Sequence, residues 1–118
     1  LVPQSPDVLI GLAFALAADG KAEEAERMHQ QAIAAQPRYA YAHIAYGNSL
    51  FGEGRVADAI VAYERATILA PDNPNAFNNL GTAYMFTGDF DRASRALERS
   101  IAIEPRRGSY SGYGSVQY

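Results

Sequence analysis

The sequence matches itself when it is shifted by 34 residues, and this repeat limits the possible folds more than any other feature. Three kinds of residue recur at that spacing: Gly20, Gly54 and Gly88; Ala25, Ala59 and Ala93; and Pro37, Pro71 and Pro105. Repeats of this length are typical of stacked helical hairpins, because one hairpin alone cannot bury its apolar face. The repeat therefore predicts a helical solenoid and favours a binding scaffold over an enzyme.

The repeat divides the chain into three copies between a leader and a tail, at residues 1–5, 6–39, 40–73, 74–107 and 108–118. Each copy predicts two helices joined by a short turn. The three glycines end the first helices, where a left-handed conformation suits glycine. The three prolines end the second helices, because proline cannot continue an α-helix. Ser5, Asn73 and Asp89 are the polar residues expected to cap the helices that follow them.

Apolar residues recur at helical spacing within the copies and predict the buried face of each helix. In the third copy the pattern runs Phe77, Leu80, Tyr84, Ala93, Leu97 and Ile101. Ala13, Gly47 and Gly81 stand at matching places, where a small residue lets the two helices of a hairpin approach closely. We expect these residues to form the core.

Composition argues against several classes of protein. The 118 residues carry a formal net charge of -3, whereas a nucleic-acid-binding domain normally has a basic stripe. Because cysteine is absent, we expect no disulfide and no cysteine-bound zinc. The apolar run of residues 8–18 is too short to span a bilayer, which needs about 20 residues. Since the sequence starts with Leu1 rather than Met, we expect a fragment of a longer protein or a processed product.

The pattern resembles the tetratricopeptide repeat family. The third copy carries the family motif most fully, with Phe77, Leu80, Gly81, Tyr84, Gly88, Asp89, Phe90, Ala93, Leu97 and Pro105. The second copy has His43 where the family favours a large aromatic residue. The first copy departs further, with Ala13 in place of the glycine and His29 in place of an aromatic residue.

The resemblance implies an all-α, right-handed α-solenoid of three antiparallel helix-turn-helix hairpins. The first helices would line a concave groove, and family members mostly bind peptides or partner proteins there. Some members grip the C-terminal carboxylate of heat-shock chaperones with Lys, Arg and Asn. This sequence has other residues at those places, namely Ile10, Phe14, Ala45, Asn75 and Asn79. A chaperone-tail receptor is therefore not expected, because the carboxylate would lose its charge-assisted hydrogen bonds.

The groove-lining helices are expected to be almost free of charge, since residues 8–18, 40–52 and 74–88 contain no ionisable acid or base apart from His43. Helical phase predicts a groove of apolar, aromatic and amide side chains: Ile10, Phe14, Tyr41, Ile44, Asn48, Phe51, Asn75, Asn78, Thr82 and Met85. Amides pair with a peptide backbone, and aromatic rings supply contact area at low entropic cost. The alternative for Tyr41, Phe51 and Met85 is packing between adjacent repeats.

The tail, GSYSGYGSVQY, is too rich in glycine and serine to form the extra helix that usually covers such an array. We expect a disordered linker. In that case Leu97, Ile101 and Ile103 would be partly exposed to solvent, which favours self-association. Two alternatives are that Tyr110, Tyr113 or Tyr118 folds back over this end, or that the tail enters the groove of a neighbouring molecule.

No pattern indicates catalysis, a metal site or a cofactor. His29 and His43 are the two histidines, and they fall in different hairpins at core positions. We therefore predict a protein–protein interaction scaffold that is not an enzyme and that holds a peptide or partner segment in a neutral groove. The alternatives are a self-assembling unit that stacks through its terminal hairpin or tail, and a substrate-recruiting module of a larger enzyme.

Overall fold

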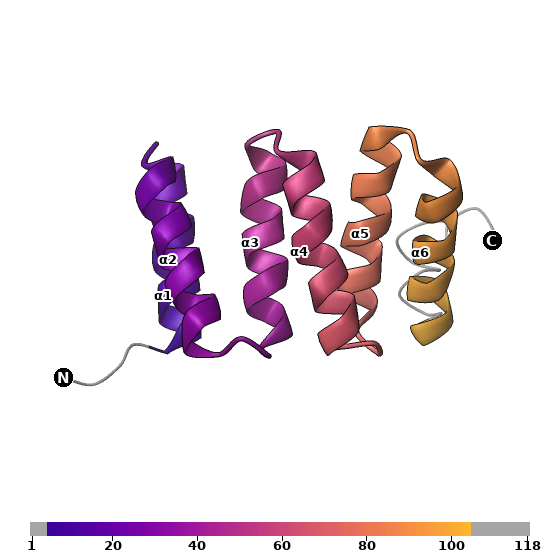
Figure 1. Cartoon of the computed structure of the whole chain (residues 1–118), viewed down its shortest axis with the longest axis horizontal. Helices are drawn as coiled ribbons and strands as arrows, with labels where there is room; N and C mark the ends of the chain where they lie inside the picture. Colours follow the sequence, from indigo (N-terminus) through magenta and orange to yellow (C-terminus); the bar gives the residue numbers. More distant parts are fainter. Residues whose placement is uncertain (1–4, 105–118) are drawn as a thin grey trace, which may run out of the picture.

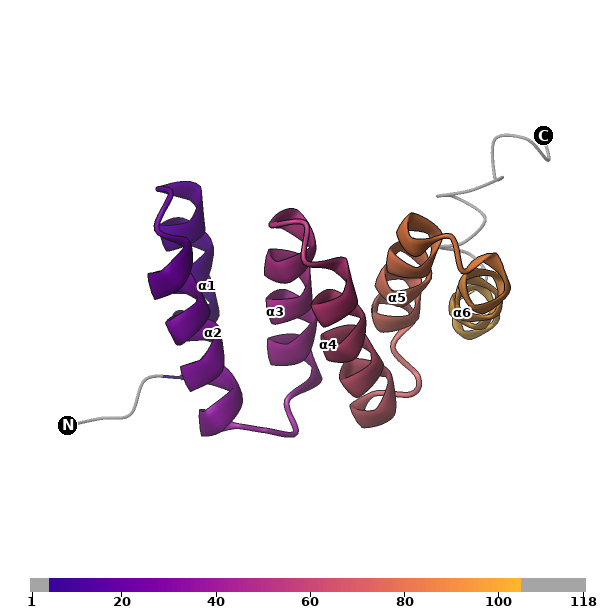
Figure 2. The ribbon, with the colours of Figure 1, turned by 45° about the horizontal axis from the view of Figure 1, so that its top comes forward.

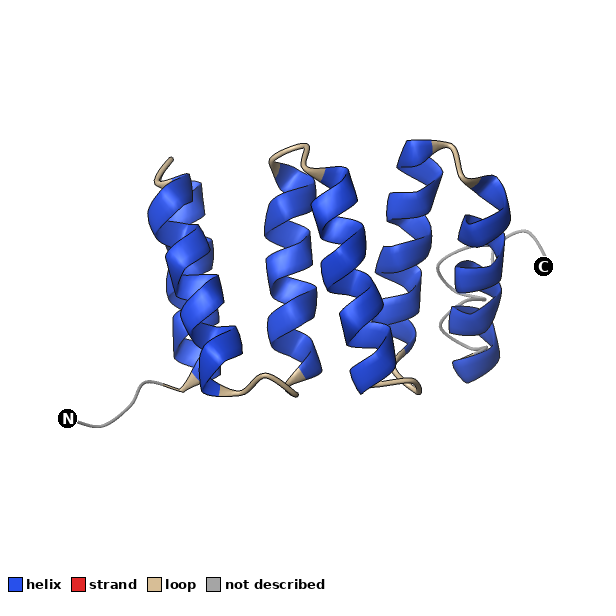
Figure 3. Cartoon of the chain, in the orientation of Figure 1, coloured by secondary structure: helices blue, strands red, loops and turns tan. Residues whose placement is uncertain are grey.

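The computed structural model describes residues 5–104, which form six α-helices in three antiparallel pairs and contain no strand (Figures 1 and 3). The helices are α1 (Pro6–Ala18), α2 (Ala22–Ala35), α3 (Ala40–Gly52), α4 (Val56–Leu69), α5 (Pro74–Thr87) and α6 (Phe90–Ile103). The pairs follow one another in a row, and a second view keeps the same order (Figure 2). This all-α hairpin solenoid is the predicted fold.

The turn inside each hairpin depends on its glycine. Gly20, Gly54 and Gly88 have φ of 80°, 82° and 82°, and no other described residue has a positive φ. Each turn is closed by the same backbone bond, in which the amide N–H after the glycine donates to a carbonyl in the last turn of the first helix. These N–H···O bonds, Lys21 to Leu16, Arg55 to Leu50 and Asp89 to Tyr84, are 2.8, 2.9 and 3.0 Å long. The predicted glycine turns are confirmed, and the bonds satisfy carbonyls that the helix end would otherwise leave unpaired.

The predicted N-caps are confirmed in the same way. The side chains of Ser5, Asn73 and Asp89 accept hydrogen bonds from backbone N–H groups in the first turns of α1, α5 and α6. Helices α2 and α4 both end two residues before a proline, as expected for a residue type that disfavours helix in its predecessor. Pro105 lies outside the described residues.

Small residues bring the two helices of each hairpin into contact. Ala25, Ala59 and Ala93 are at most 2% exposed. A Cβ atom added at Gly47 would lie 2.5 Å from Cε1 of Tyr63, so the ring packs directly on the glycine backbone. Gly81 faces Leu97 in the same manner, and its added Cβ would lie 2.7 Å from Cγ.

Polar bonds on the second helices tie neighbouring hairpins together. The hydroxyl of Tyr46 on α3 donates to Glu26 on α2 over 3.0 Å, and Arg55 also pairs with Glu26 at 2.8 Å. The hydroxyl of Tyr84 on α5 donates to Glu64 on α4. Apart from Asp7 in the first turn of α1, the acidic and basic side chains of residues 5–104 other than the histidines lie at turns and on second helices. None of the helices within residues 5–104 has the length and hydropathy that a membrane crossing requires.

Candidate functional site

The face made by α1, α3 and α5 carries the residues that helical phase assigned to a groove. Phe14, Tyr41 and Met85 are 77%, 49% and 50% exposed. Among the polar candidates, four are exposed: Asn48, Asn75, Asn78 and Thr82. Exposed apolar and amide groups therefore alternate along this face.

Three of the predicted groove residues are less exposed than their helical phase predicts. Ile44 is 5% exposed and packs with Ala66 and Ala76, so its expected exposure is wrong. The reason is that it closes the contact of α3 with both α4 and α5. Ile10 is 6% exposed, although part of it still lines a cavity. Phe51 is half-buried and meets Phe86 edge-on, with ring centroids 4.8 Å apart.

The other predicted surface is the terminal hairpin. Leu97, Ile101 and Ile103 on α6 are half-buried. Tyr110, Tyr113 and Tyr118 lie outside the described residues, and the alternatives for the tail stay predictions.

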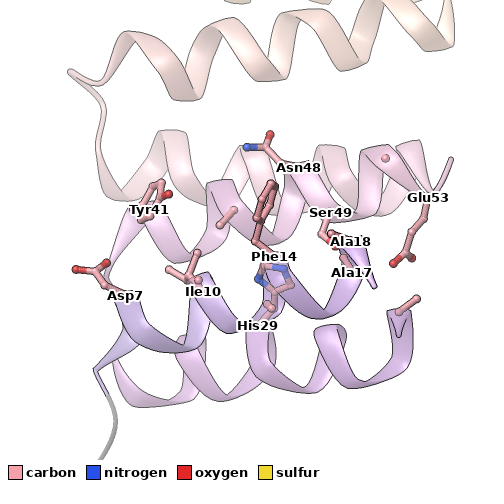
Figure 4. A pocket seen from close by; sticks show the side chains of 15 residues that line it. Asp7, Ile10, Phe14, Ala17, Ala18, His29, Tyr41, Asn48, Ser49 and Glu53 are labelled. Carbon is pink, nitrogen blue, oxygen red and sulfur yellow. The ribbon is translucent and has the colours of Figure 1, made fainter. Parts of the chain in front are cut away.

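A large cavity opens between the first two hairpins (Figure 4). Its volume is about 950 Å³, and its walls come from α1, α2, α3 and Glu53 in the turn after α3. The lining is mostly apolar and small, and its larger side chains include Ile10, Phe14, His29, Tyr41 and Asn48. A space of this size and lining is typical of a ligand-binding cleft.

A smaller cavity of about 290 Å³ lies on the same face between α3 and α5, with Tyr63 of α4 at its base. Its lining residues are Asn48, Phe51, Gly52, Tyr63, Asn79 and Thr82. Asn48 and Gly52 line both cavities. The two spaces therefore adjoin each other at α3, and both belong to the candidate site.

An amide pair marks the place where the cavities meet. The Oδ1 atom of Asn48 accepts the Tyr63 hydroxyl over 2.6 Å and the Nδ2 group of Asn79 over 3.4 Å. Both contacts use the carbonyl oxygen, so the NH₂ group of Asn48 and the carbonyl of Asn79 remain for other partners. Helical phase did not assign Asn79 to the groove, although the resemblance placed it at a position of the chaperone-tail clamp. Its position four residues after Asn75 on one helix face was a further signal for it.

The site is close to neutral. Helices α1, α3 and α5 contain no Lys or Arg. The two acids at the rim of the large cavity are engaged, since Asp7 accepts the Tyr39 hydroxyl over 2.6 Å and Glu53 lies 3.6 Å from Arg55. Burial raises the pKa of Tyr63 to about 12, so its hydroxyl keeps its proton and acts as a donor to Asn48.

The two histidines have core positions, as predicted. His43 is 9% exposed and its Nε2 lies 2.9 Å from the carbonyl oxygen of Pro37. His29 is 4% exposed, and its Nδ1 is the one buried side-chain N or O atom without a hydrogen-bond partner among the described residues. Burial lowers the pKa of His29, although the charge of Glu26 partly opposes the shift. No group of three metal-binding side chains occurs within residues 5–104.

Comparison with known families decides what kind of chain this is. Two tetratricopeptide repeat family models match, one over residues 10–74 and the other over residues 50–112. The chain belongs to the tetratricopeptide repeat family. The resemblance seen in the sequence is thus confirmed, and with it the hairpin solenoid of a family of protein-interaction scaffolds.

One curated relative is the Hsp70-Hsp90 organizing protein of Triticum aestivum, which is 33% identical over 89 residues. The match covers 73% of this chain but 15% of that protein, so the chain spans a small part of its relative.

Solved structures share the fold. The first tetratricopeptide-repeat domain of Spaghetti (RPAP3), bound to the HSP90 peptide SRMEEVD, has a TM-score of 0.79 at 21% identity, covering 90% of this chain and 84% of that one. MamA has a TM-score of 0.80 at 26% identity, covering 93% of this chain and 64% of that one. At these identities the likeness concerns the arrangement of the repeats.

Proposed function

We propose that this tetratricopeptide-repeat chain is a protein-interaction module that binds a neutral peptide or partner segment along the face of α1, α3 and α5. The observation that carries the proposal is the amide pair of Asn48 and Asn79, which lies between two cavities on that face. One amide offers donors and the other an acceptor, which is the combination that a peptide backbone requires.

The exposed apolar residues beside the amide pair support the same proposal. Phe14 and Tyr41 flank the large cavity, and Met85 extends the face onto α5. Side chains of this kind contribute contact area to an interface, whereas their full exposure to water is unfavourable. A bound segment would therefore gain backbone hydrogen bonds at the centre and apolar contacts on both sides.

The charge of the face argues for a neutral ligand. The Spaghetti domain binds the peptide SRMEEVD, which carries three acidic side chains. On α1, α3 and α5 of this chain no Lys or Arg is present to pair with such charges. Burial of unpaired carboxylates is costly, so an acidic peptide should bind weakly.

Selection of peptides from a random displayed library tests the proposal. We expect the enriched peptides to be neutral with aromatic or aliphatic anchors, and we expect SRMEEVD to bind at least tenfold more weakly by fluorescence anisotropy. The variant Asn48→Asp keeps an acceptor for the Tyr63 hydroxyl but removes the NH₂ donors. The affinity should therefore fall about tenfold, as for the loss of one strong hydrogen bond.

The matched control is Gln31→Glu, the same change from amide to acid at an exposed position of α2. It should leave peptide affinity unchanged. Equal losses of peptide affinity in both variants would show that the added negative charge alone causes the effect. Enrichment of acidic peptides from the library would contradict the proposal.

A further inference from the structure

The two junctions between hairpins differ in how they are filled. Between the second and third hairpins, the rings of Phe51 and Phe86 meet with centroids 4.8 Å apart. The residues 34 positions earlier are Ala17 and Gly52. Both line the large cavity between the first and second hairpins. The large cavity is therefore the place where this chain lacks the pair of rings that meets at the next junction, where the cavity is about 290 Å³.

A third small residue enlarges the same space. Val56 packs against the core of the second hairpin, and its counterpart in the first hairpin is Ala22, which lines the cavity. A Cβ added at Gly52 would meet no atom within 4 Å. The wall at Gly52 is therefore open, and the cavity volume of about 950 Å³ exceeds that of an aromatic side chain.

His29 is a buried polar residue that lines the cavity. Its counterpart in the second hairpin is Tyr63, whose hydroxyl donates to Asn48. In the first hairpin Phe14 stands where Asn48 stands in the second, so no amide is available at that place. The Nδ1 atom of His29 consequently has no partner within the described residues although the side chain is 4% exposed. Such atoms are rare in folded proteins, because a buried polar group without a hydrogen bond is destabilising.

We infer that this cavity receives a tyrosine side chain of the bound peptide, with its ring between the first two hairpins and its hydroxyl donating to Nδ1 of His29 once the side chains that cover this buried atom move aside. The inference rests on the proposed function and adds a residue preference to it. The ring takes the place of the side chains missing at Ala17 and Gly52, and the hydroxyl supplies the bond that His29 lacks. A phenylalanine would leave Nδ1 unpaired, and an acidic side chain would find no cation on these walls.

Side-chain analogues test the cavity apart from the rest of the groove. The full ¹⁵N-labelled chain is titrated with p-cresol, the analogue of tyrosine, and with toluene, the analogue of phenylalanine, while backbone amide shifts are followed by NMR. We expect p-cresol to shift residues around Ala17, His29 and Gly52, with millimolar affinity about fivefold tighter than toluene. Shifts confined to other residues, or equal affinities for both probes, would overturn the inference.

Two kinds of variant sharpen the test. Ala17→Phe combined with Gly52→Phe restores the pair found at Phe51 and Phe86, and should weaken p-cresol binding at least tenfold while the helical circular dichroism persists. Ala57→Phe, at an exposed position of α4, is the matched control and should change nothing. His29→Leu, which introduces the residue found at Leu97, should retain toluene binding and abolish the preference for p-cresol. If the double variant does not fold, Ala17→Phe alone serves the same purpose.

Peptides selected against the whole face separate this inference from the proposed function. If they contain tyrosine and lose affinity for the doubly filled variant, both stand. If they bind the filled variant as well as the original chain, the peptide-binding face stands and the tyrosine cavity is overturned. If p-cresol enters the cavity but no peptide binds, the peptide proposal fails while the cavity keeps its preference for a phenol. Concentration-dependent shifts of the cavity residues without any probe would overturn the choice of a partner peptide in favour of a second copy of the chain.

Discussion

At the scale of single residues, each repeat position has a different tolerance for change because each meets a different neighbour. Gly54 has a φ of 82°, whereas Gly52, two residues earlier, lies in the last turn of α3 with no positive φ and an open side. Gly47 lies against the ring of Tyr63. The same residue type thus serves a turn, leaves a cavity open and allows a close approach.

The contrast between Gly54 and Gly52 gives a first prediction. Gly54→Ala should lower the free energy of unfolding by about 1 kcal/mol, because a side chain is strained at this φ. Gly52→Ala should leave stability unchanged or raise it by up to about 1 kcal/mol, since alanine favours helix. Urea denaturation of both variants measures the difference, and equal destabilisation would contradict the assignment of the turn to Gly54.

His29 gives a second prediction at this scale. Its pKa in the folded chain lies below the ordinary value of 6.5 because burial disfavours the charged ring, despite the opposing charge of Glu26. The unfolded chain therefore binds the proton first, and the free energy of unfolding decreases as the pH falls from 6.5 toward the folded pKa of His29.

His29→Leu should remove this pH-dependent loss. At pH 7 it should also raise the free energy of unfolding by about 1 kcal/mol, because Nδ1 no longer lies buried without a partner. Urea denaturation between pH 7.5 and about 5 compares the variant with the original chain. Because the two chains differ only at residue 29, the difference between their pH dependences reports on His29. An unchanged pH dependence in the variant would mean that His29 is not the group responsible.

At the scale of helices, the two junctions differ in packing. Both junctions contain an isoleucine packed with two alanines, Ile10 with Ala32 and Ala42 at α2–α3 and Ile44 with Ala66 and Ala76 at α4–α5. Both also contain a Tyr–Glu hydrogen bond, from Tyr46 to Glu26 and from Tyr84 to Glu64. The α4–α5 side adds the contact of Phe51 with Phe86, whereas the α2–α3 side adjoins the cavity of about 950 Å³ and has the ion pair of Arg55 with Glu26 instead. Exposed ion pairs add little stability, so the first junction should be the weaker one.

Hydrogen exchange measures this difference. Amides in the middle of α1 and α2 should exchange faster than those of α4 and α5, because opening the first junction exposes less packed surface. Ala17→Phe with Gly52→Phe should slow exchange in α1 and α2 by filling the gap. Uniform protection across all six helices in residues 5–104 would show that the cavity does not weaken the junction.

At the scale of the whole molecule, the terminal hairpin is the surface through which copies of the chain could stack. Leu97, Ile101 and Ile103 on α6 are half-buried, with no further helix after α6 within the described residues. Stacking through this end is the alternative function predicted from the sequence, and it stays a prediction.

Light scattering over a concentration series tests that alternative with the full chain and with a version ending at Arg107. If stacking uses α6, both should associate, because the apolar side chains are present in both. Association of the full chain alone would assign the contact to the tail, and two monomers would exclude stacking under those conditions.

The sequence alone determined the features that depend on neighbours along the chain. Helix ends, glycine turns and caps follow from local chemistry, and the 34-residue repeat extends that chemistry to three hairpins. For the same reason most of the residues that helical phase assigned to the groove on α1, α3 and α5 are exposed. Tertiary structure decided what depends on the spacing between hairpins. Ile44 is buried because two other helices meet at it, Asn79 joins Asn48 across two helices, and the small residues Ala17 and Gly52 make a cavity only when the hairpins stack. These distances are set by which side chains from separate repeats fill the same space, and a single repeat does not contain that information.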